Sequence, residues 1–432
     1  MQDAPDEPLF TDRVAGVDVA KATVEVTIRV PGESHPGRRQ QETRGFPTTR
    51  AGLDALADWL GCWQVSKVGM EATGDYWKPV LFLLESRGFA CELYNAGQVK
   101  ALPGRPKTDR VDSIWLAKIV ERGMVRSSFV PPEPIRRLRT HTRYRRVLTQ
   151  ARTAEKQRVA KLLEDGHLKL SSVISDIHGV SGRDMLDAIA AGCRDPNVLA
   201  GLARGTMRAK TSRLREALDC SFFTTEHAAV LTLMLATIDH YTRQIDALTA
   251  RIETLTGPYL RQIEQLDAVP GIGPIGAQDV IAEIGVDMSV FPTAAHLVSW
   301  AHWSPQVRES AGKRKGTNST GRGNPFLGAA LGEAAISAGR TQSFYGARYR
   351  RLTRRMPKKK ALVAVGNSML TTIHALLSDP TANYQDLGPD YYQRRLHVAR
   401  QARNHVLSLQ RLGYQVTITP VDPDTGELAT PA

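Results

Sequence analysis

The sequence predicts an α/β domain at residues 13–135, followed by a mainly helical remainder. Strand-like and helix-like patterns alternate only in this first part, which implies a sheet covered by helices. The segment Pro131-Pro132-Glu133-Pro134 ends the alternation, and the chain then becomes helical and strongly basic. A long heptad pattern farther on indicates extended helical packing.

Each element of the α/β part follows from a local pattern. Short apolar runs predict buried strands, alternation of apolar and polar residues predicts a partnering strand, and i, i+3, i+4, i+7 spacing predicts an amphipathic helix. In chain order we expect strands at 14–17 and 24–30, a helix at 53–60, a strand at 68–70, a helix at 76–88 and a strand at 91–94.

Four carboxylates mark a candidate site in this domain. Asp18 ends the first predicted strand and Glu71 ends the strand at 68–70. Asp109 and Asp112 stand three residues apart, so they share one face of a helix's first turn. Converging acids suit two divalent ions roughly 3.5–4 Å apart, the arrangement for in-line phosphodiester displacement. The alternative is four unrelated acids, because the helix dipole alone favours Asp in a first turn.

Composition narrows the classes of function. The 432-residue chain carries a net charge of +13, which suits a polyanionic partner. Its four cysteines lack CxxC spacing and no histidine pair shows metal spacing, which argues against a disulfide scaffold and a zinc module. The acidic N-terminus has no signal-like apolar stretch and no uninterrupted apolar run approaches membrane-spanning length. We therefore expect a soluble protein of the cytosol with no membrane partner.

Residues 136–265 predict a basic helical region with a coiled coil. Arginines crowd residues 136–158, and we expect Arg143, Arg145 and Arg146 to contact nucleic acid, with a solvated helix face as the alternative. Eight residues then follow a heptad seam that predicts either a coiled coil between protomers or an antiparallel hairpin within the chain. They are Leu231, Met234, Ile238, Tyr241, Ile245, Leu248, Ile252 and Leu255.

Residues 266–378 form a third region with two candidate nucleic-acid contacts. The turn Pro270-Gly271-Ile272-Gly273 could aim the backbone N–H groups of Gly271 and Gly273 at a phosphate, although a tight helix–helix turn also needs glycine. Residues 348–360 are rich in Lys and Arg and predict a contact through Arg350, Arg351, Arg354 and Arg355, with a solvated charged face as the alternative. Residues 379–432 read as an extension with a helix at 390–409 and a strand from 414, and residues 1–12 as a flexible N-terminus.

Ser310 is a candidate nucleophile in the segment Glu309-Ser310-Ala311-Gly312-Lys313-Arg314-Lys315. A seryl hydroxyl needs activation to attack, and Lys313, Arg314 and Lys315 could stabilise the charge that develops on a phosphate. The residues alone leave open that Ser310 only caps a turn, and Ser304 and Ser319 have similar surroundings.

Five segments together resemble the DEDD transposases of insertion-sequence family one-hundred-ten, which are related to pilin-gene-inverting recombinases. The resemblance covers about Arg13 to Ser378. Its carriers are Gly16-Val17-Asp18-Val19-Ala20-Lys21, Met70-Glu71-Ala72-Thr73-Gly74, Lys107-Thr108-Asp109-Arg110-Val111-Asp112, Pro270-Gly271-Ile272-Gly273 and Glu309-Ser310-Ala311-Gly312-Lys313-Arg314.

The resemblance implies a RuvC-like (ribonuclease H-like) N-terminal domain whose quartet Asp18, Glu71, Asp109 and Asp112 binds Mg²⁺ or Mn²⁺. It also implies a C-terminal transposase domain with Ser310 as nucleophile, a guide (bridge) RNA encoded by the element, donor and target DNA as partners, and a dimer or tetramer. One departure stands out: the family's Arg after Gly-Asn is absent from Gly323-Asn324-Pro325-Phe326-Leu327-Gly328, so a contact is lost or moved to Arg322.

With the resemblance, the residues predict an RNA-guided DNA recombinase of an insertion element. Two alternatives remain at this stage. One is a metal-dependent nuclease or junction resolvase without a covalent intermediate, and the other is a nucleic-acid-binding scaffold without activity. Metal-dependent cutting separates the scaffold from the two enzymes, and a covalent protein–DNA adduct separates the recombinase from the nuclease.

Overall fold

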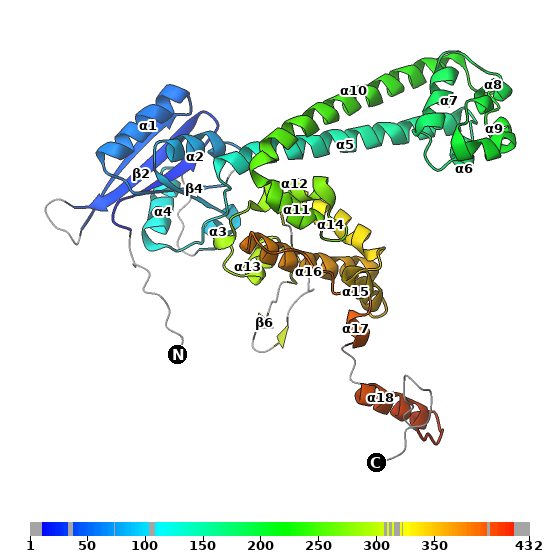
Figure 1. The fold of residues 1–432 in the computed structure, drawn as a ribbon. Helices are drawn as coiled ribbons and strands as arrows, with labels where there is room; N and C mark the ends of the chain where they lie inside the picture. Colours follow the sequence, from blue (N-terminus) through cyan, green and yellow to red (C-terminus); the bar gives the residue numbers. More distant parts are fainter. Residues whose placement is uncertain are drawn as a thin grey trace. The chain divides into compact units, whose positions relative to one another are not determined.

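The computed structural model describes residues 11–32, 38–72, 74–102, 109–305, 309–310, 313–314, 320–321, 323–394 and 398–418 (Figure 1). Side chains of residues 109–110, 309–310, 313–314 and 398–401 lie outside this description. Most of the predicted N-terminal tail, Ser319 and Arg322 also lie outside it. Its contacts divide the chain into two compact units, Met1–Val130 and Pro131–Ala432.

The first unit is built on a five-stranded mixed sheet in the order β3-β2-β1-β4-β5. Strand β1 pairs antiparallel with β2 and parallel with β4, and β4 pairs parallel with β5. Parallel β1 and β4 therefore have their carboxyl ends at the same edge of the sheet. The bounds are β1 Val14–Val19, β2 Thr23–Pro31, β3 Arg39–Pro47, β4 Lys67–Glu71 and β5 Ala90–Tyr94.

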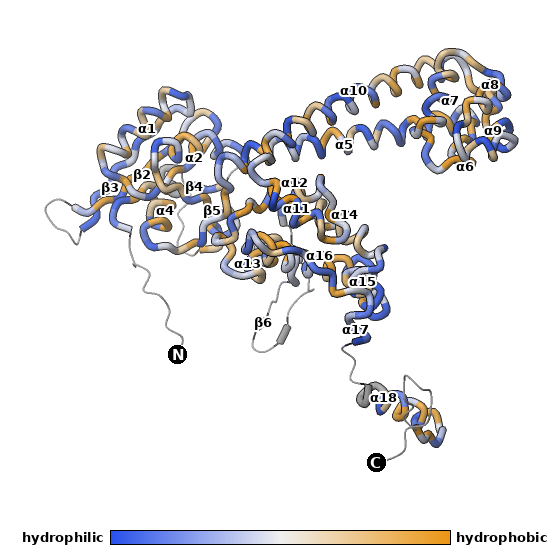
Figure 2. The backbone as a smooth tube through the Cα atoms, viewed as in Figure 1, coloured by the Kyte–Doolittle hydropathy of each residue, from blue (hydrophilic) through white to orange (hydrophobic). Residues whose placement is uncertain are grey.

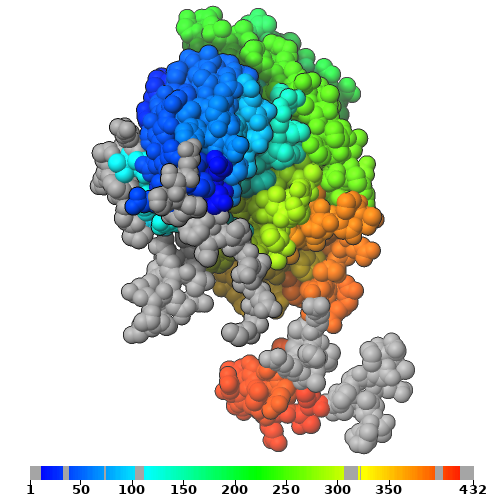
Figure 3. Space-filling view, turned by 90° about the vertical axis from the view of Figure 1, so that its left-hand side faces the viewer, coloured from blue at the N-terminus to red at the C-terminus, as the bar shows by residue number. Residues whose placement is uncertain are grey.

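Helices cover both faces of this sheet, and the unit is closely packed in the space-filling view (blue to cyan in Figure 3). Helices α1 (Arg50–Cys62) and α2 (Trp77–Ser86) share a core with alternate strand residues such as Val17 and Met70. Helix α4 (Asp109–Arg122) contacts β1, β2 and β4 and covers the other face, and α3 spans Ala96–Ala101. The predicted α/β architecture is confirmed for this unit.

Strand β3 is the one strand in this sheet that the sequence patterns did not predict. Its sequence, Arg-Gln-Gln-Glu-Thr-Arg-Gly-Phe-Pro, has almost no apolar residues, and none of them is fully buried. It lies at the edge of the sheet, where pairing with β2 through the backbone holds it in place. Such a strand leaves little hydrophobic pattern, because its own side chains bury little surface.

The second unit begins with two long antiparallel helices, α5 (Glu133–Asp165) and α10 (Thr225–Thr256), which lie side by side (Figure 1). The predicted heptad residues of α10 are buried or half-buried within this one chain, and hydrophobic and hydrophilic residues alternate along both helices (Figure 2). The structure thus contains the hairpin alternative, and a coiled coil between protomers stays a prediction. The connection forms a small helical cap with its own core: α6 Leu170–Val173, α7 Val180–Ala190, α8 Pro196–Gly201, η1 Gly205–Lys210 and α9 Thr211–Ala217.

The rest of this unit is a helical bundle with one short hairpin. Helix α12 packs on α5, α11 and α14, and α16 packs on α13, α14 and α15. The bounds are η2 Gly257–Tyr259, α11 Leu260–Asp267, α12 Gly273–Ile284, η3 Met288–Val290, α13 Ala294–Trp300, β6 Glu309–Ser310, β7 Lys313–Arg314, α14 Pro325–Gly339, α15 Phe344–Thr353, α16 Lys358–Ser378, α17 Tyr391–Arg394 and α18 Val398–Arg411. Residues 414–418 form no strand, contrary to the expectation for the extension.

Helix α16 is, among the described residues, long and apolar enough to cross a membrane by length and composition. The sequence patterns did not single it out, because Lys358, Asn367 and His374 interrupt its apolar residues. Its inner face, with Val365 and Ile373 fully buried, packs within the bundle as the core helix of a folded domain does.

Candidate functional site

Asp18 and Glu71 lie at neighbouring strand ends on one face of the sheet. In the parallel pair, Gly16 is opposite Gly69 and Val17 is opposite Met70, so the two acids come next in the register. Both glycines face α4: a Cβ on Gly16 would lie 2.1 Å from the Ala117 nitrogen, and one on Gly69 would lie 2.2 Å from Val120 Cγ2. Because side chains alternate along a strand, the acids two residues on face the same side.

Helix α4 runs antiparallel to β1 and brings its first turn to that edge. The carbonyl of Glu121 accepts a hydrogen bond from Thr11 just before β1, and the Ser113 carbonyl lies over Gly16. Ser113 also hydrogen-bonds Thr27 of β2 at 2.8 Å, which fixes the helix over the sheet. Asp109, about one turn before Ser113, and Asp112, directly before it, therefore lie toward the end of β1 that carries Asp18. The fold thus brings three elements with acidic residues to one edge.

The donor chemistry of these acids fits a hard divalent cation, since Mg²⁺ and Mn²⁺ prefer carboxylate oxygens. Asp18, Glu71 and Asp112 are half-buried, and the side chain of Asp109 lies outside the described part. Among the side chains that the structure describes, no three Asp, Glu, His or Cys residues are grouped closely enough to hold a metal ion. A metal site here needs Asp109 or a movement of the other carboxylates.

The sequence patterns missed a fifth carboxylate on this face. Glu25 of β2 lies directly opposite Asp18 in the antiparallel pair, so both point to the side covered by α4. Gly45 on β3 accommodates it, since a Cβ there would lie 2.7 Å from Glu25 Oε1. The alternation over residues 24–30 put Glu25 on a polar face, and only the register with β1 places it beside Asp18.

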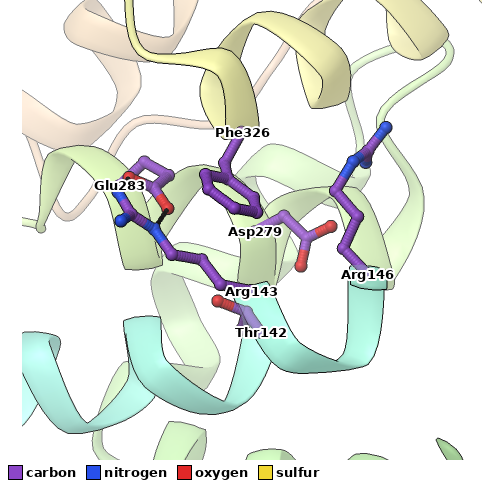
Figure 4. Close-up of a pocket in the computed structure, with 6 residues that line it drawn as sticks. All are labelled: Thr142, Arg143, Arg146, Asp279, Glu283 and Phe326. Atoms are coloured by element: carbon purple, nitrogen blue, oxygen red, sulfur yellow. Dashed lines mark hydrogen bonds and ion pairs between the residues drawn. The ribbon is translucent and has the colours of Figure 1, made fainter. Parts of the chain in front are cut away.

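In the second unit, the predicted phosphate-contacting arginines of α5 meet acids of the same chain (Figure 4). Arg143 binds Glu283 of α12 through two hydrogen bonds of 2.7 and 2.8 Å, and its guanidinium lies 4.5 Å from the Phe326 ring centroid. Arg139 lies 3.4 Å from the same carboxylate and donates to the carbonyls of Ala282 and Glu283. Burial lowers the pKa of Arg139 to about 10, while Glu283 opposes that shift.

Arg145 and Arg146 are paired in different surroundings. Arg145 is buried and donates to Gln278 and Asp279 of α12 at 2.8 Å, so its guanidinium is not accessible to a phosphate in this structure. Burial raises the pKa of Asp279, although Arg145 acts against this. Arg146 bonds Glu333, a carboxylate that is 70% exposed. Both arginines were expected to bind nucleic acid because arginines crowd residues 136–158. Their acidic partners lie more than 130 positions away and could not be read from that run.

At the turn that contains Gly271 and Gly273, the first glycine is needed for tight packing between helices, which was the alternative to a phosphate contact. Gly271 has φ +94°, and a Cβ on it would lie 2.4 Å from the Ala334 carbonyl oxygen of α14. Gly273 has φ +65° with open space around its Cβ position. Gly271 therefore serves close packing, and Gly273 begins α12 with room beside it.

Ser310 lies on a short two-stranded hairpin. Glu309 pairs with Arg314 and Ser310 with Lys313, so the serine and the cations are adjacent along the backbone. The side chains of Ser310, Lys313 and Arg314 and all of Lys315 lie outside the described part. The expectation that the hydroxyl attacks a phosphate is thus a proposal.

The basic segment formed by the last turn of α15 and the residues just after it lies on the surface. Arg350, Arg351, Arg354 and Arg355 are all exposed. Arg351 lies 4.4 Å over the ring of Tyr392, which belongs to the C-terminal extension, and Arg350 bonds Thr341 and Gln342. No acid is paired with these four arginines among the described ion pairs.

Two family models match parts of this chain. A family model of DEDD transposases of the IS110 type, described as "Transposase", matches residues 15–167, and one described as "Transposase IS116/IS110/IS902 family" matches residues 263–350. A "Probable family 20 transposase" of Pseudomonas aeruginosa is 28% identical over 222 residues, 48% of this chain and 64% of that protein. The chain thus spans just under two thirds of that relative's length.

Among solved structures, T. thermophilus RuvC in complex with a Holliday junction substrate is similar at 12% identity and a TM-score of 0.19, covering 25% of this chain and 90% of that chain. A likeness at this score carries no argument about the fold. The two family models match in order, one over the acidic face and one over the serine-bearing bundle. The chain belongs to the IS110 family of transposases.

Proposed function

We propose that this protein is a DNA recombinase that cuts and rejoins strands of DNA during transposition. The observation that carries the proposal is the meeting of Asp18, Glu71 and the first turn of α4 at one edge of the sheet. Acids gathered at one edge of a mixed sheet support a ribonuclease H-like first unit that acts on phosphodiesters. Membership in a transposase family supports DNA as the substrate.

Asp18, Glu71, Asp109 and Asp112 would hold Mg²⁺ or Mn²⁺. When bound, the ions supply charge neutralisation at the attacking and leaving oxygens of the phosphate. The chain itself would position the ligands: β1 and β4 would hold the carboxylates of Asp18 and Glu71, and α4 those of Asp109 and Asp112. Gly16 and Gly69 allow α4 to approach the sheet closely enough for this.

Ser310 would form the covalent intermediate. Its Oγ bonds to phosphorus as its proton leaves to solvent, and the P–O bond to the leaving strand breaks, with that strand's oxygen taking up a proton. Attack by the hydroxyl of another strand reverses the step, forms the new P–O bond and releases the serine. Lys313, Arg314 and Lys315 follow closely enough in the chain to stabilise the charged phosphate.

The proposed recombinase acts in the cytosol as a dimer or tetramer. Its proposed partners are a guide RNA, donor DNA and target DNA. The exposed arginines in the last turn of α15 and just after it support nucleic-acid binding. Equal affinity for any RNA of matched length, with no preference for RNA transcribed beside the gene, would count against guidance.

The metal site is tested with Asp18→Asn in the full-length protein. We expect loss of Mg²⁺-dependent DNA cleavage with the fold retained, and loss of the rise in thermal midpoint that Mg²⁺ gives by mass action. The matched control is Asp54→Asn, an acid of α1 that pairs with Arg50 and Arg87 on the opposite face. Full cleavage by Asp18→Asn means that the acidic site is misassigned.

The covalent step is tested by trapping. Wild-type protein should form an adduct with cut DNA that survives denaturant and disappears on protease treatment. Ser310→Ala should lose adduct and recombination but keep DNA affinity, because one hydroxyl contributes little to a charged interface. Ser304→Ala should keep the adduct. Cleavage that persists without any adduct favours the metal-only nuclease instead.

A further inference from the structure

The segment that carries Ser310 leaves and rejoins the bundle at adjacent points. At its start, the Trp303 carbonyl accepts a hydrogen bond from Asn367 of α16 at 3.0 Å, and a Cβ on Gly366 would lie 2.2 Å from the Trp303 ring. At its end, a Cβ on Gly323 would lie 2.5 Å from the Ala301 carbonyl oxygen. The two ends of the segment therefore lie close to each other on the bundle.

Asn324 fastens the second end through two different atoms. Its Oδ1 accepts from the N–H groups of Phe326 and Leu327 at 3.0 and 3.3 Å, which caps the start of α14. Its Nδ2 donates to Glu283 Oε2 at 2.5 Å. Capping needs only an oxygen at this position, so the amide nitrogen serves a separate contact.

Glu283, which accepts this hydrogen bond from Asn324, also pairs with arginines of α5. Its side chain is only 2% exposed, and it accepts hydrogen bonds from Arg143 and Asn324 with Arg139 beside it. Arg143 also lies on the ring of Phe326, two residues beyond Asn324. A buried carboxylate that loses such partners is left uncompensated, so α5, α12 and the start of α14 are held in one arrangement.

We propose that Glu283 is a positioning residue for the strand-transfer reaction. Through Asn324 it sets where the serine-bearing segment rejoins the bundle, and through Arg143 it couples that point to helix α5. The inference rests on the proposed role of Ser310, and it assigns a function to the Gly323-Asn324 motif that does not need the absent arginine.

The experiment changes the donor without removing the cap. Asn324→Asp keeps a capping oxygen but sets a carboxylate against Glu283, while Asn324→Asp combined with Glu283→Gln restores one amide and one carboxylate across the same contact. The matched control is Glu333→Gln, which removes an exposed ion pair between α5 and α14. The readouts are the single-turnover rate of adduct formation, DNA affinity, the thermal midpoint, and trypsin cleavage after Lys313 and Arg314.

For Asn324→Asp we expect adduct formation roughly a hundredfold slower, as for a displacement of about 1 Å at a reacting group. DNA affinity should stay within about twofold, because a charged interface depends on many contacts. Trypsin cleavage should become faster. The exchanged pair should recover most of the lost rate, and Glu333→Gln should behave as wild type.

The outcomes separate the two proposals. No adduct from the wild type overturns the proposed function and with it any role of Glu283 in the reaction. A wild-type adduct that Asn324→Asp forms at full rate overturns the positioning role alone. A rate loss that only follows the thermal midpoint, with no recovery in the exchanged pair, also overturns it, because a purely structural role predicts that result.

Discussion

Replacing Gly16 by alanine tests how closely α4 must approach the sheet. The new Cβ would lie 2.1 Å from the Ala117 nitrogen and 2.4 Å from the Ser113 carbonyl oxygen, both backbone atoms that no rotamer change can move. Real Cβ contacts are essentially never shorter than 3.0 Å, so the helix must shift by about 0.9 Å to relieve the first contact. Overpacking of this kind costs about 1–3 kcal/mol.

The same shift moves the first turn of α4, which carries Asp109 and Asp112. A displacement of about 1 Å at a reacting group lowers a rate by roughly a hundredfold. We therefore expect Gly16→Ala to lose Mg²⁺-dependent cleavage far beyond its loss of stability, and to keep DNA affinity that depends on the second unit.

Hydrogen exchange measured by mass spectrometry gives the local readout. A loss of about 1–3 kcal/mol speeds exchange of the most protected amides of α4 by roughly five- to 150-fold. The control is Gly61→Ala in α1, whose Cβ position is open, and which should stabilise its helix by about 0.5–1 kcal/mol. Unchanged exchange in α4 together with full cleavage by Gly16→Ala would refute the reasoning.

Three further predictions concern the second unit. Arg145→Ala should destabilise it by about 3–5 kcal/mol in urea unfolding, because Asp279, which is 17% exposed, loses the cation that compensates its charge. Glu333→Gln, which changes a carboxylate that is 70% exposed, should cost less than about 1 kcal/mol. Burial lowers the pKa of His178 from its usual value of 6.5, so near and below that pH this histidine binds more protons in the unfolded chain than in the folded one. The thermal midpoint should therefore fall as the pH drops from 7 to 5, and a His178→Gln variant should show a smaller fall. Arg354→Ala and Arg355→Ala should each lower the slope of log affinity against log salt by about 1 without changing the fold; an unchanged slope would remove these two arginines after α15 from the nucleic-acid interface.

Local sequence determined the elements of the first unit and the place of its acids. Apolar runs and alternation mark β1, β2, β4 and β5, because burial on one or both faces of a sheet imposes that pattern. Asp18 and Glu71 could be placed at strand ends for the same reason. The edge strand β3 and the short helices between α5 and α10 bury little surface of their own or depend on a shared core, so their patterns are weak.

Only the tertiary structure decided which charges face each other. Arg143 and Glu283 are 140 positions apart. A run of arginines looks alike in the sequence whether it binds phosphates or pairs with buried acids, so the run by itself does not identify its partners. The register of β1 with β2 likewise placed Glu25 beside Asp18, and the approach of α12 to α14 gave Asn324 its partner. Periodicity reports which face of an element is buried, but the identity of a charged partner depends on packing between distant segments, which local sequence does not encode.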